Sequence, residues 1–533
     1  MRKSAGWTAA IAATLVPLVA MTYLFNRNAE YLSGAQVFLA GGLMMGLSLV
    51  AYFAFRWLFR SRLAGFLGCL TSWVVFFGFS ALYTILVEDR RLIGASMYIR
   101  VYAAAGGLLL LIVLFLTRRR ESPSFCAFML VFTGVLLAMN LVPAVQTTLT
   151  VRAEDRSVDL TKVKTEFSVD PAAQTPNVYW FHLDGMLGLD AHATWLGDDQ
   201  AEFRAALKER GFALNEKASF EANHTTSVAV PALMCPYFYD NFMAEALTGG
   251  KPIGEALTKS ELRAARLRNE MVLAFKARGY ATTVIAPYSE YFTVLVDRYY
   301  DVYDFSNGGI LPFEGSDEQI LAQHQERSTL FNMFVLLLKR WALPAFRRTL
   351  YIGGVGAKAL EAPYAGLKDA LGPYYASKPQ TVNFFNALND ALNHPMGKPS
   401  LNVMHYMLAH YPFVNEADGK PATGDIDDIH SYPGHQHYAA DVLIRSLDMI
   451  LARDPEAVIV LQADHGLHGQ SRAQITAAFG TDAVRPIWNG VVSALRVPEK
   501  YESGEESFAL SNPLNMSRYL VNSFVGGNYA YVQ

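Results

Sequence analysis

Five long apolar runs before residue 145 constrain this chain more than any other feature of its sequence. Each run is close to the roughly 20 residues that an α-helix needs to cross the hydrocarbon core of a bilayer. Almost no charged residue interrupts them, which disfavours core helices of a water-soluble protein. The runs are Trp7–Phe25, Gln36–Phe55, Ala64–Val87, Val101–Thr117 and Phe125–Val145. We therefore expect an all-α transmembrane domain of five helices over residues 1–145.

The basic residues between the runs predict how these helices are oriented. Cytoplasmic loops carry an excess of Lys and Arg. Basic residues precede the first run and follow the second and fourth runs. They are Arg2, Lys3, Arg56, Arg60, Arg62, Arg118, Arg119 and Arg120. The third loop also carries arginines, but Glu88 and Asp89 lie beside them. The first run lacks a small-residue cleavage site, so it is interpreted as an anchor. We expect a multi-pass protein of the bacterial inner (cell) membrane, with everything after Val145 periplasmic or extracellular.

Two further regions follow the apolar runs. Residues 146–175 are polar and irregular, and we expect a juxtamembrane linker or surface helix there. Over residues 176–533, strand-like and helical segments alternate, which predicts a layered α/β domain with a mainly parallel sheet. The expected strands are Val178–Leu183, Ala281–Ala286, Asn402–Leu408, Val458–Gln462 and Gly490–Leu495. The expected helices include Gln200–Arg210, Lys259–Arg278 and Tyr438–Ala452.

Charge and cysteine content exclude some classes of protein. The net charge of −3 over 533 residues gives no general affinity for nucleic acid, and no basic stripe or base-stacking motif is present. Of the three cysteines, Cys69 and Cys126 lie in apolar runs, so Cys235 is alone in the external part. No disulfide can therefore form within that part.

Chemistry-bearing residues follow three of the expected strands. Asp184-Gly185 follows the first strand, His410 follows "NVMHYMLA", and Asp464-His465-Gly466 with His468 follows "VIVLQA". Ligands bind at the carboxyl ends of strands in open α/β sheets, and a carboxylate beside an imidazole suits a divalent metal. His405, inside its strand, is interpreted as a core histidine whose hydrogen bonds are satisfied. A lone strand-end aspartate is more often a helix cap, so Asp184 is weak as a single signal.

A group of hydroxyl residues provides candidate nucleophiles. In "EANHTTSVAVPALM", Thr225, Thr226 and Ser227 precede an apolar stretch. A hydroxyl at a helix N-terminus is usually a cap, but one that is bound to a metal can act as a nucleophile. Spacing does not choose among the three.

The order of these motifs resembles the sulfatase-like, membrane-anchored branch of the alkaline phosphatase superfamily, from about residue 176 to the C-terminus. "TSVAVPALM" is similar to the sulfatase frame C-x-P-S-R-x-x-L-L, "VMHYMLAHYP" to a segment of lipid A phosphoethanolamine transferases, and "ADHGLHG" to D-H-G-E-H-L-G. The closing segment "LSNPLNMSRYLVNSF" is also like that of membrane-bound members. The resemblance implies an alkaline-phosphatase-like fold with Asp184, Thr226, Asp464 and His465 as ligands of zinc or manganese. It also implies that Thr226 is the nucleophile and that His410 and His468 contact substrate.

The activity implied by this resemblance is transfer of a phospholipid head group, of phosphoethanolamine or phosphoglycerol type, to a cell-envelope glycan or lipid. A phospho-threonine would be the intermediate and a membrane phospholipid the donor. Threonine in place of cysteine, and Val230 in place of the frame's arginine, depart from true sulfatases and disfavour sulfate esters. The lack of external disulfides departs from typical phosphoethanolamine transferases, which puts the head group in doubt. Two alternatives remain open: a metal-dependent phosphodiesterase or sulfatase-like hydrolase, and a non-catalytic lipid-sensing envelope protein.

Two other segments have competing interpretations. Ser328–Leu350 is apolar and then basic, which is typical either of a helix at the membrane interface or of a buried helix with a solvated basic end. The loop "GDIDDIHSYPGHQH" is either a solvated loop over the site or the holder of a second metal. Its candidate ligands are Asp425, Asp427, Asp428, His430, His435 and His437.

Overall fold

A computed structural model describes residues 4–533 with several gaps. The gaps are 29–33, 84–94, 157–161, 223–224, 249–252, 287–290, 303–313, 322, 324–378, 412, 421, 423–427 and 468–471. The helix expected over Ser328–Leu350 therefore lies outside the described residues. The chain divides between residues 157 and 158 into two compact units, and each is described below by itself.

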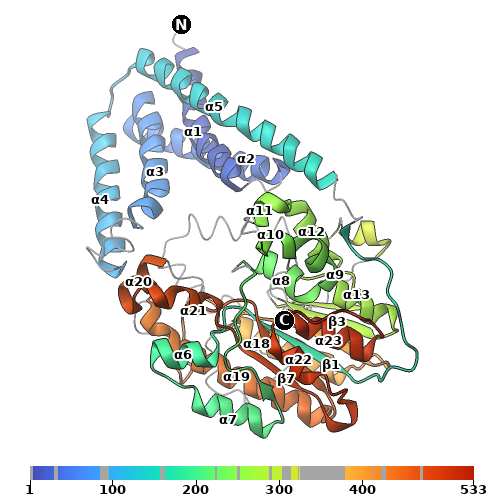
Figure 1. Cartoon of the computed structure of the whole chain (residues 1–533). Coiled ribbons are helices and arrows are strands. Elements are labelled where there is room, and N and C mark those ends of the chain that lie inside the picture. Colours follow the sequence, from blue (N-terminus) through green and yellow to red (C-terminus); the bar gives the residue numbers. More distant parts are fainter. Residues whose placement is uncertain are drawn as a thin grey trace. The chain divides into compact units, whose positions relative to one another are not determined.

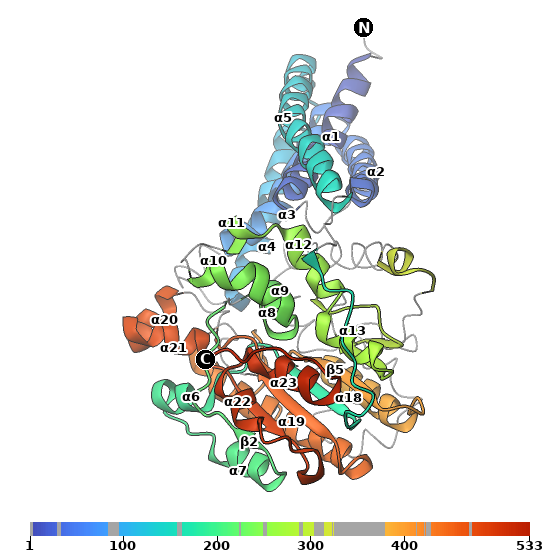
Figure 2. The same cartoon turned by 45° about the vertical axis from the view of Figure 1, so that its right-hand side comes forward.

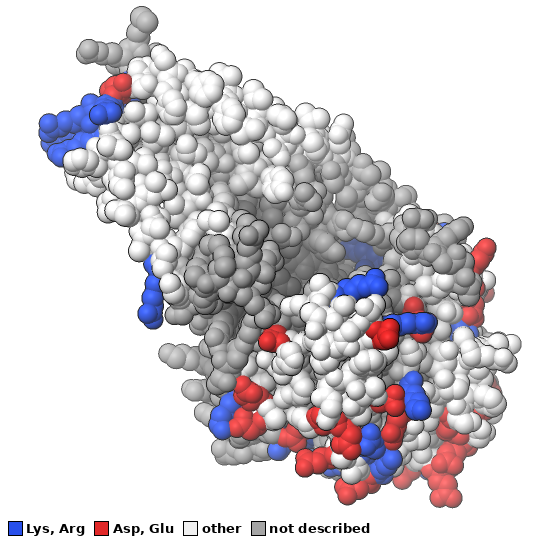
Figure 3. Space-filling view, turned by 60° about the vertical axis from the view of Figure 1, so that its left-hand side comes forward, with Lys and Arg blue, Asp and Glu red and all other residues white. Residues whose placement is uncertain are grey.

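The first unit is helical throughout its described part (Figure 1). Its helices are α1 (Ser4–Asn28), α2 (Gly34–Phe59), α3 (Arg62–Tyr83), α4 (Ala95–Leu116) and α5 (Pro123–Arg156), which match the five apolar runs. Two stretches, Gly41–Phe59 and Pro123–Gln146, are long and apolar enough to cross a membrane, and three other helices contain shorter apolar stretches. Figure 3 shows that much of this unit's surface carries no charge. The number of passes stays a prediction.

Residues 146–175, where we expect a linker, are divided between the two units after residue 157. Helix α5 continues to Arg156, so the polar region expected from residue 146 begins as helix. Further along, Lys164 Nζ donates to the Tyr529 hydroxyl (2.7 Å), and the Asp170 amide donates to the Val525 carbonyl (2.7 Å). Arg278 donates to the carbonyls of Pro171 and Ala173. The linker is thereby fastened to the C-terminal segment and to the end of helix α13 (Glu270–Ala277).

The second unit is built on a seven-stranded sheet of order β2-β7-β6-β1-β5-β3-β4 (Figure 2). The strands are β1 (Val178–Leu183), β2 (Ala213–Leu214), β3 (Ala281–Ala286), β4 (Arg298–Asp301), β5 (Ser400–Tyr406), β6 (Val458–Ala463) and β7 (Ser493–Arg496). Strands β6, β1, β5, β3 and β4 are parallel to one another, and β7 is antiparallel to β6. The mainly parallel α/β domain predicted from the sequence is therefore confirmed.

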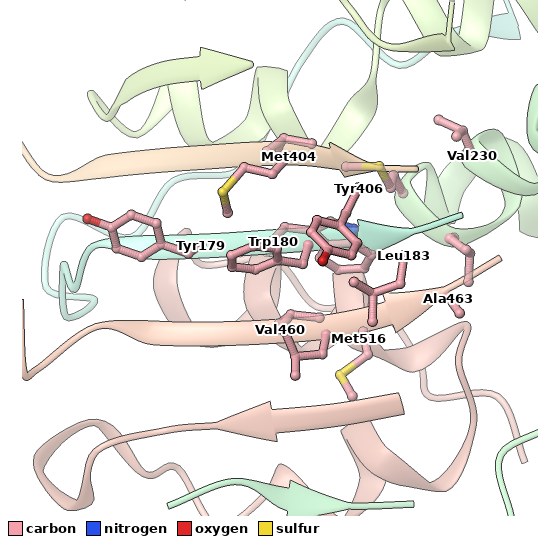
Figure 4. Packing of buried hydrophobic residues seen from close by; sticks show 14 of the residues in the cluster. Tyr179, Trp180, Leu183, Val230, Met404, Tyr406, Val460, Ala463 and Met516 are labelled. Carbon is pink, nitrogen blue, oxygen red and sulfur yellow. The ribbon is translucent and has the colours of Figure 1, made fainter. Parts of the chain in front are cut away.

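The central strands are apolar because both of their faces are covered. Every residue of β1 and β6 is buried, as expected for strands in the middle of a parallel sheet. Figure 4 shows Trp180, Tyr406 and Val460 of the three central strands in one core, with Met516 and Val230 beside them. The last two belong to α23 (Asn515–Phe524) and α8 (Thr226–Met234). This core holds the carboxyl ends of β6, β1 and β5 next to each other.

Several details of the secondary structure differ from prediction. The expected helix Lys259–Arg278 is two helices, α12 (Lys259–Leu267) and α13, because Asn269 caps α13 by accepting from the Val272 amide (3.2 Å). The last expected strand begins at Ser493 instead of Gly490 and runs antiparallel to β6. Strands β2 and β4 were not predicted, because they are too short to show a period.

Candidate metal centre and nucleophile

The site lies where three neighbouring parallel strands end. Asp184 follows β1, His410 follows β5, and Asp464 and His465 follow β6. Since β1 pairs with both β5 and β6 in parallel, these three strand ends share one edge of the sheet. Asp184, Asp464 and His465 are buried, whereas the His410 side chain is 31% exposed. The edge therefore combines buried carboxylates with one imidazole that solvent reaches.

Asp184 is at the centre of the site. Its Oδ1 lies 3.3 Å from His465 Nε2 and 3.7 Å from His410 Nε2. Its Oδ2 accepts hydrogen bonds from Thr226 Oγ1 (3.3 Å) and from His405 Nε2 (2.8 Å). One carboxylate thus contacts the candidate nucleophile on one oxygen and two candidate ligands on the other.

Asp464 occupies the same edge from the opposite side. Its Oδ1 accepts from the Gly185 amide (3.3 Å). Its Oδ2 lies 3.7 Å from His465 Nε2 and 3.4 Å from Nε2 of the buried His182. His182 belongs to β1 and His405 to β5, so each carboxylate is contacted by a histidine from a neighbouring strand.

The ring orientations of two histidines suit metal binding. His465 Nδ1 lies 2.8 Å from the Gly466 carbonyl, and His410 Nδ1 lies 2.6 Å from the Tyr411 carbonyl. A carbonyl can only accept, so Nδ1 carries the proton and donates in both rings. Each Nε2 then faces Asp184. A histidine whose second nitrogen donates to a backbone carbonyl is the usual arrangement around a bound metal.

The donor set fits a divalent cation. Ligand atoms of Asp184, His410 and His465 lie within 4.8 Å of one another. The buried oxygens Asp184 Oδ1 and Asp464 Oδ2 face His465 Nε2 and His182 Nε2 at 3.3 Å and 3.4 Å. Two carboxylates at one buried place also repel each other. A cation bound by both oxygens would offset this repulsion.

The pKa values of Asp184 and His465 reflect these contacts. Burial favours the neutral form of Asp184, but His410, His405 and His465 outweigh it and hold the pKa of that carboxyl well below its usual range. Burial also lowers the pKa of His465, yet the Asp464 and Asp184 carboxylates raise it to about 9. Without a metal, a protonated His465 is therefore the cation that offsets the two carboxylates at neutral pH.

Thr226 is the hydroxyl residue that reaches this group. It lies in the first turn of α8 and is buried, whereas Thr225 before it is exposed. The partial positive charge at a helix N-terminus stabilises negative charge that develops on nearby oxygens. The position of Thr226 therefore suits an oxygen nucleophile.

Two glycines allow the strand ends to approach one another. Gly185 has a φ of +73°, in the left-handed region that favours glycine. A Cβ at Gly466 would lie 2.2 Å from the Ile487 carbonyl oxygen and 2.8 Å from that of Gly490. Only glycine fits there, and its neighbour His465 is held in place as a result.

The structure brings together five of the six residues predicted for the site: Asp184, Thr226, Asp464, His465 and His410. His468 lies outside the described residues. His410, predicted to contact substrate, is also near enough to Asp184 to act as a ligand. The hydrogen bond from His405 to Asp184 agrees with the expectation of a satisfied core histidine, but its contact with the site was not expected.

Sequence reasoning missed His182 altogether. A signal did exist, because side chains two residues apart point to the same face of a strand. His182 is two residues before Asp184, and its register partner on β5 is His405.

The Asp/His-rich loop does not gather into one site within its described part. His430 Nδ1 lies 2.8 Å from Asp428 Oδ1, while His437 Nε2 lies 2.6 Å from Asp198 Oδ2. His435 is buried in α19 (Tyr432–Arg453). Asp425 and Asp427 lie outside the described residues. His430 and His437 are thus paired with different carboxylates.

Comparison with solved structures finds several proteins to which the chain is distantly similar. The periplasmic domain of EcEptC from Escherichia coli, in complex with Zn, is 12% identical (69% of this chain, 88% of that chain, TM-score 0.39). The integral membrane lipooligosaccharide phosphoethanolamine transferase A of Neisseria meningitidis is 10% identical (98% and 97%, TM-score 0.38). The lipoteichoic acid synthase LtaP of Listeria monocytogenes is 13% identical (71% and 79%, TM-score 0.35). No curated protein matches the sequence.

The assignment to a family rests on a sequence model instead of these distant structures. The model of the sulfatase family matches residues 190–485. This range includes Thr226, His410, Asp464 and His465, and it spans more than half of the 533 residues. The chain belongs to the sulfatase family.

Proposed function

We propose that this protein is a metal-dependent transferase that moves a phospholipid head group, of phosphoethanolamine or phosphoglycerol type, to a cell-envelope glycan or lipid. The observation that carries the proposal is the contact of the Thr226 hydroxyl with Asp184, in a group that also holds the buried Asp464 and His465 and the partly exposed His410. A threonine cannot be converted to the formylglycine of true sulfatases. Phosphoryl chemistry on the hydroxyl is therefore favoured over sulfate ester hydrolysis.

Asp184, Asp464, His465 and Thr226 would hold the metal, zinc or manganese, and His410 lies beside them. When bound, such a cation lowers the pKa of a hydroxyl and offsets negative charge on phosphoryl oxygens. Histidine and carboxylate ligands suit either metal. The buried carboxylate oxygens of Asp184 and Asp464 and the His465 Nε2 that faces both of them support this ligand set.

In the first step, Thr226 Oγ1 would attack the phosphorus of the lipid as an alkoxide, its proton having been released to solvent when the metal binds. The bond from phosphorus to the diacylglycerol oxygen would break, and that oxygen would take up a proton. His410 is partly exposed and its Nε2 faces the site, so it is placed to deliver this proton. In the second step, an acceptor hydroxyl would give its proton back to His410 Nε2 and attack the same phosphorus, and Thr226 Oγ1 would leave as the alkoxide. The N-terminus of α8 favours the charge that develops on Thr226 Oγ in both steps.

The apolar helices of the first unit support a lipid donor. A phospholipid does not leave the bilayer, so an enzyme attached to the same membrane meets its donor at a high effective concentration. We propose that the protein is an inner-membrane, multi-pass enzyme with residues 1–145 as its transmembrane domain. Residues 146–175 would be the linker and residues 176–533 the periplasmic catalytic domain.

Mass spectrometry of Thr226 tests the proposal. After incubation of the full chain with total membrane lipid, we expect a mass increment on Thr226 that identifies the head group. Thr226→Ala should lose the adduct and at least about 10³-fold in turnover, because the nucleophile is removed. Ser227→Ala, which removes the neighbouring hydroxyl, should keep the adduct. Full turnover by Thr226→Ala would refute the role of Thr226.

The same experiment separates the alternatives. Label from the lipid that reaches a glycan or second lipid supports transfer, whereas label released as free head group supports a hydrolase. A purified protein that binds neither zinc nor manganese and forms no adduct would instead be a lipid sensor.

A further inference from the structure

Two connections of the helical unit come together at one end. The Arg119 amide donates to the Phe59 carbonyl (3.2 Å), and the Arg62 amide donates to Glu121 Oε1 (3.1 Å). The Ser61 hydroxyl also donates to the Arg120 carbonyl. The α2–α3 and α4–α5 connections are thus joined by hydrogen bonds, although about 60 residues separate them in the sequence.

This contact concentrates positive charge at one place. The two connections and the last turn of α2 contribute six arginines: Arg56, Arg60, Arg62, Arg118, Arg119 and Arg120. Glu121 is the one acidic residue in these segments. Figure 3 shows basic side chains gathered at one end of a surface that is otherwise mostly uncharged. Such a concentration of charge requires anions nearby.

A cavity lies beside two of these arginines. It has a volume of about 510 Å³ and is lined by Phe53, Arg56, Trp57, Leu58 and Arg60. Phe53 lies three and four residues before Arg56 and Trp57, and these lie four and three residues before Arg60. The four side chains therefore share one side of α2 and the residue that follows it. Trp57 is 80% exposed and Phe53 is 44% exposed. The cavity therefore offers two guanidinium groups between large apolar side chains.

An apolar cavity occupies the same end of α2. It has a volume of about 500 Å³ and is lined by Phe59 together with Leu111, Ile112, Phe115 and Leu116 of α4. Phe59 lies in the sequence between Leu58 and Arg60, which line the basic cavity. A basic and an apolar cavity at one helical turn suit an amphipathic ligand.

We propose that the last turn of α2 binds the head group of an anionic phospholipid. Arg56 and Arg60 hold the phosphate, because guanidinium groups bind phosphate oxygens through paired hydrogen bonds. Trp57 lies at the level of the head groups, where tryptophan is favoured. The acyl chains lie against apolar side chains such as Phe53 and Phe59. Clusters of Lys and Arg at the end of a membrane helix bind anionic head groups in this way. This site involves none of the residues proposed for catalysis.

Native mass spectrometry of the full-length protein in detergent tests this site. We expect phosphatidylglycerol to remain bound at concentrations at which phosphatidylcholine is lost. The variant Arg56→Gln/Arg60→Gln should bind phosphatidylglycerol about 30-fold more weakly, which corresponds to about 1 kcal/mol for each charge. Arg100→Gln removes an exposed charge near the other end of α4 and should bind as the wild type does. Arg56→Lys/Arg60→Lys keeps both charges but loses the paired hydrogen bonds, so its affinity should lie between those of the wild type and of Arg56→Gln/Arg60→Gln.

Three results would overturn the proposal. The first is equal phosphatidylglycerol binding by the wild type and by Arg56→Gln/Arg60→Gln, with both eluting as single species on gel filtration. The second is equal retention of phosphatidylcholine by the wild type. The third is displacement of bound phosphatidylglycerol by millimolar inorganic phosphate, which would indicate a site for phosphate instead of lipid. Thr226→Ala should bind phosphatidylglycerol normally, so failure of the proposed transferase activity would leave this result unaffected.

Discussion

The carboxyl edge of the sheet and the last turn of α2 both gather charged residues, but in opposite surroundings. At the sheet edge, Asp184, Asp464 and His465 are buried and contact one another. At the end of α2, the arginines lie beside exposed Trp57 and Phe53. A buried charge is stable only with a partner at short distance. Exposed charges are solvated and screened by salt, so each one contributes little and several are needed to attract an anion. Substitutions should therefore have large effects at the first place and small effects on folding at the second.

Backbone packing gives the largest expected difference between the two regions. Gly466→Ala should lower the free energy of unfolding by about 3 kcal/mol, because its Cβ would overlap two backbone carbonyls. Gly42→Ala in α2 is the matched change, since nothing lies within 4 Å of the Cβ that the alanine would add. It should cause little or no destabilisation. Thermal unfolding of both variants in detergent measures this. Equal midpoints for the two variants would show that the sheet edge is not tightly packed.

A buried histidine that contacts a site carboxylate and an exposed histidine far from it in sequence provide the second comparison. His182→Ala removes the partner of Asp464 Oδ2 and should weaken binding of zinc or manganese by about 10- to 100-fold. His394→Ala is the control, since His394 is an exposed histidine with a carboxylate partner of its own, Asp390. Competition with a chelating indicator measures both affinities. Unchanged affinity in His182→Ala would mean that Asp464 keeps its position without this contact.

The pKa of His465 gives the third expected effect. It is raised to about 9 from an ordinary value near 6.5, so the metal-free site holds a proton below about pH 9. The stability that this proton contributes is complete below about pH 6.5 and is lost as the pH rises through 9. A metal must displace the proton, so metal affinity should rise about tenfold per pH unit between pH 7 and 9.

Calorimetry in buffers of different ionisation enthalpy measures the number of protons released. Thr226→Ala should be used as the background, because a metal-bound threonine would release a proton of its own. We expect about one proton at pH 7 and markedly fewer above pH 9. In His465→Gln the pH dependence over this range should disappear, and its persistence would show that another group holds the proton.

Much of the fold was predictable because it depends on local pattern. The five apolar runs match five helices, and the bounds predicted for the first strand match β1 without change. The break at Asn269 was missed because both halves share one apolar pattern and a single side-chain cap separates them. β2 and β4 were missed because two to four residues are too few to show a period, and their pairing depends on neighbouring strands.

The candidate site was predictable to a different extent. Strand-end carboxylates and histidines are visible in a sequence, since parallel strands deliver them to one edge. By contrast, the contacts of His182 and His405 with Asp464 and Asp184 depend on which strands are neighbours. Strand order β6-β1-β5 joins residues more than 200 positions apart, and no local pattern encodes it.

The sequence by itself determined the five apolar helices, the α/β class of the rest of the chain, and the residue types of the site. These features follow from periodicity and composition, which act over a few turns or strands. Tertiary structure alone decided that the Thr226 hydroxyl meets Asp184, that His465 lies between two carboxylates, and that two arginine-rich connections join at one end of the helical unit. Each of these contacts joins distant segments, and packing of the whole unit sets the distance between them.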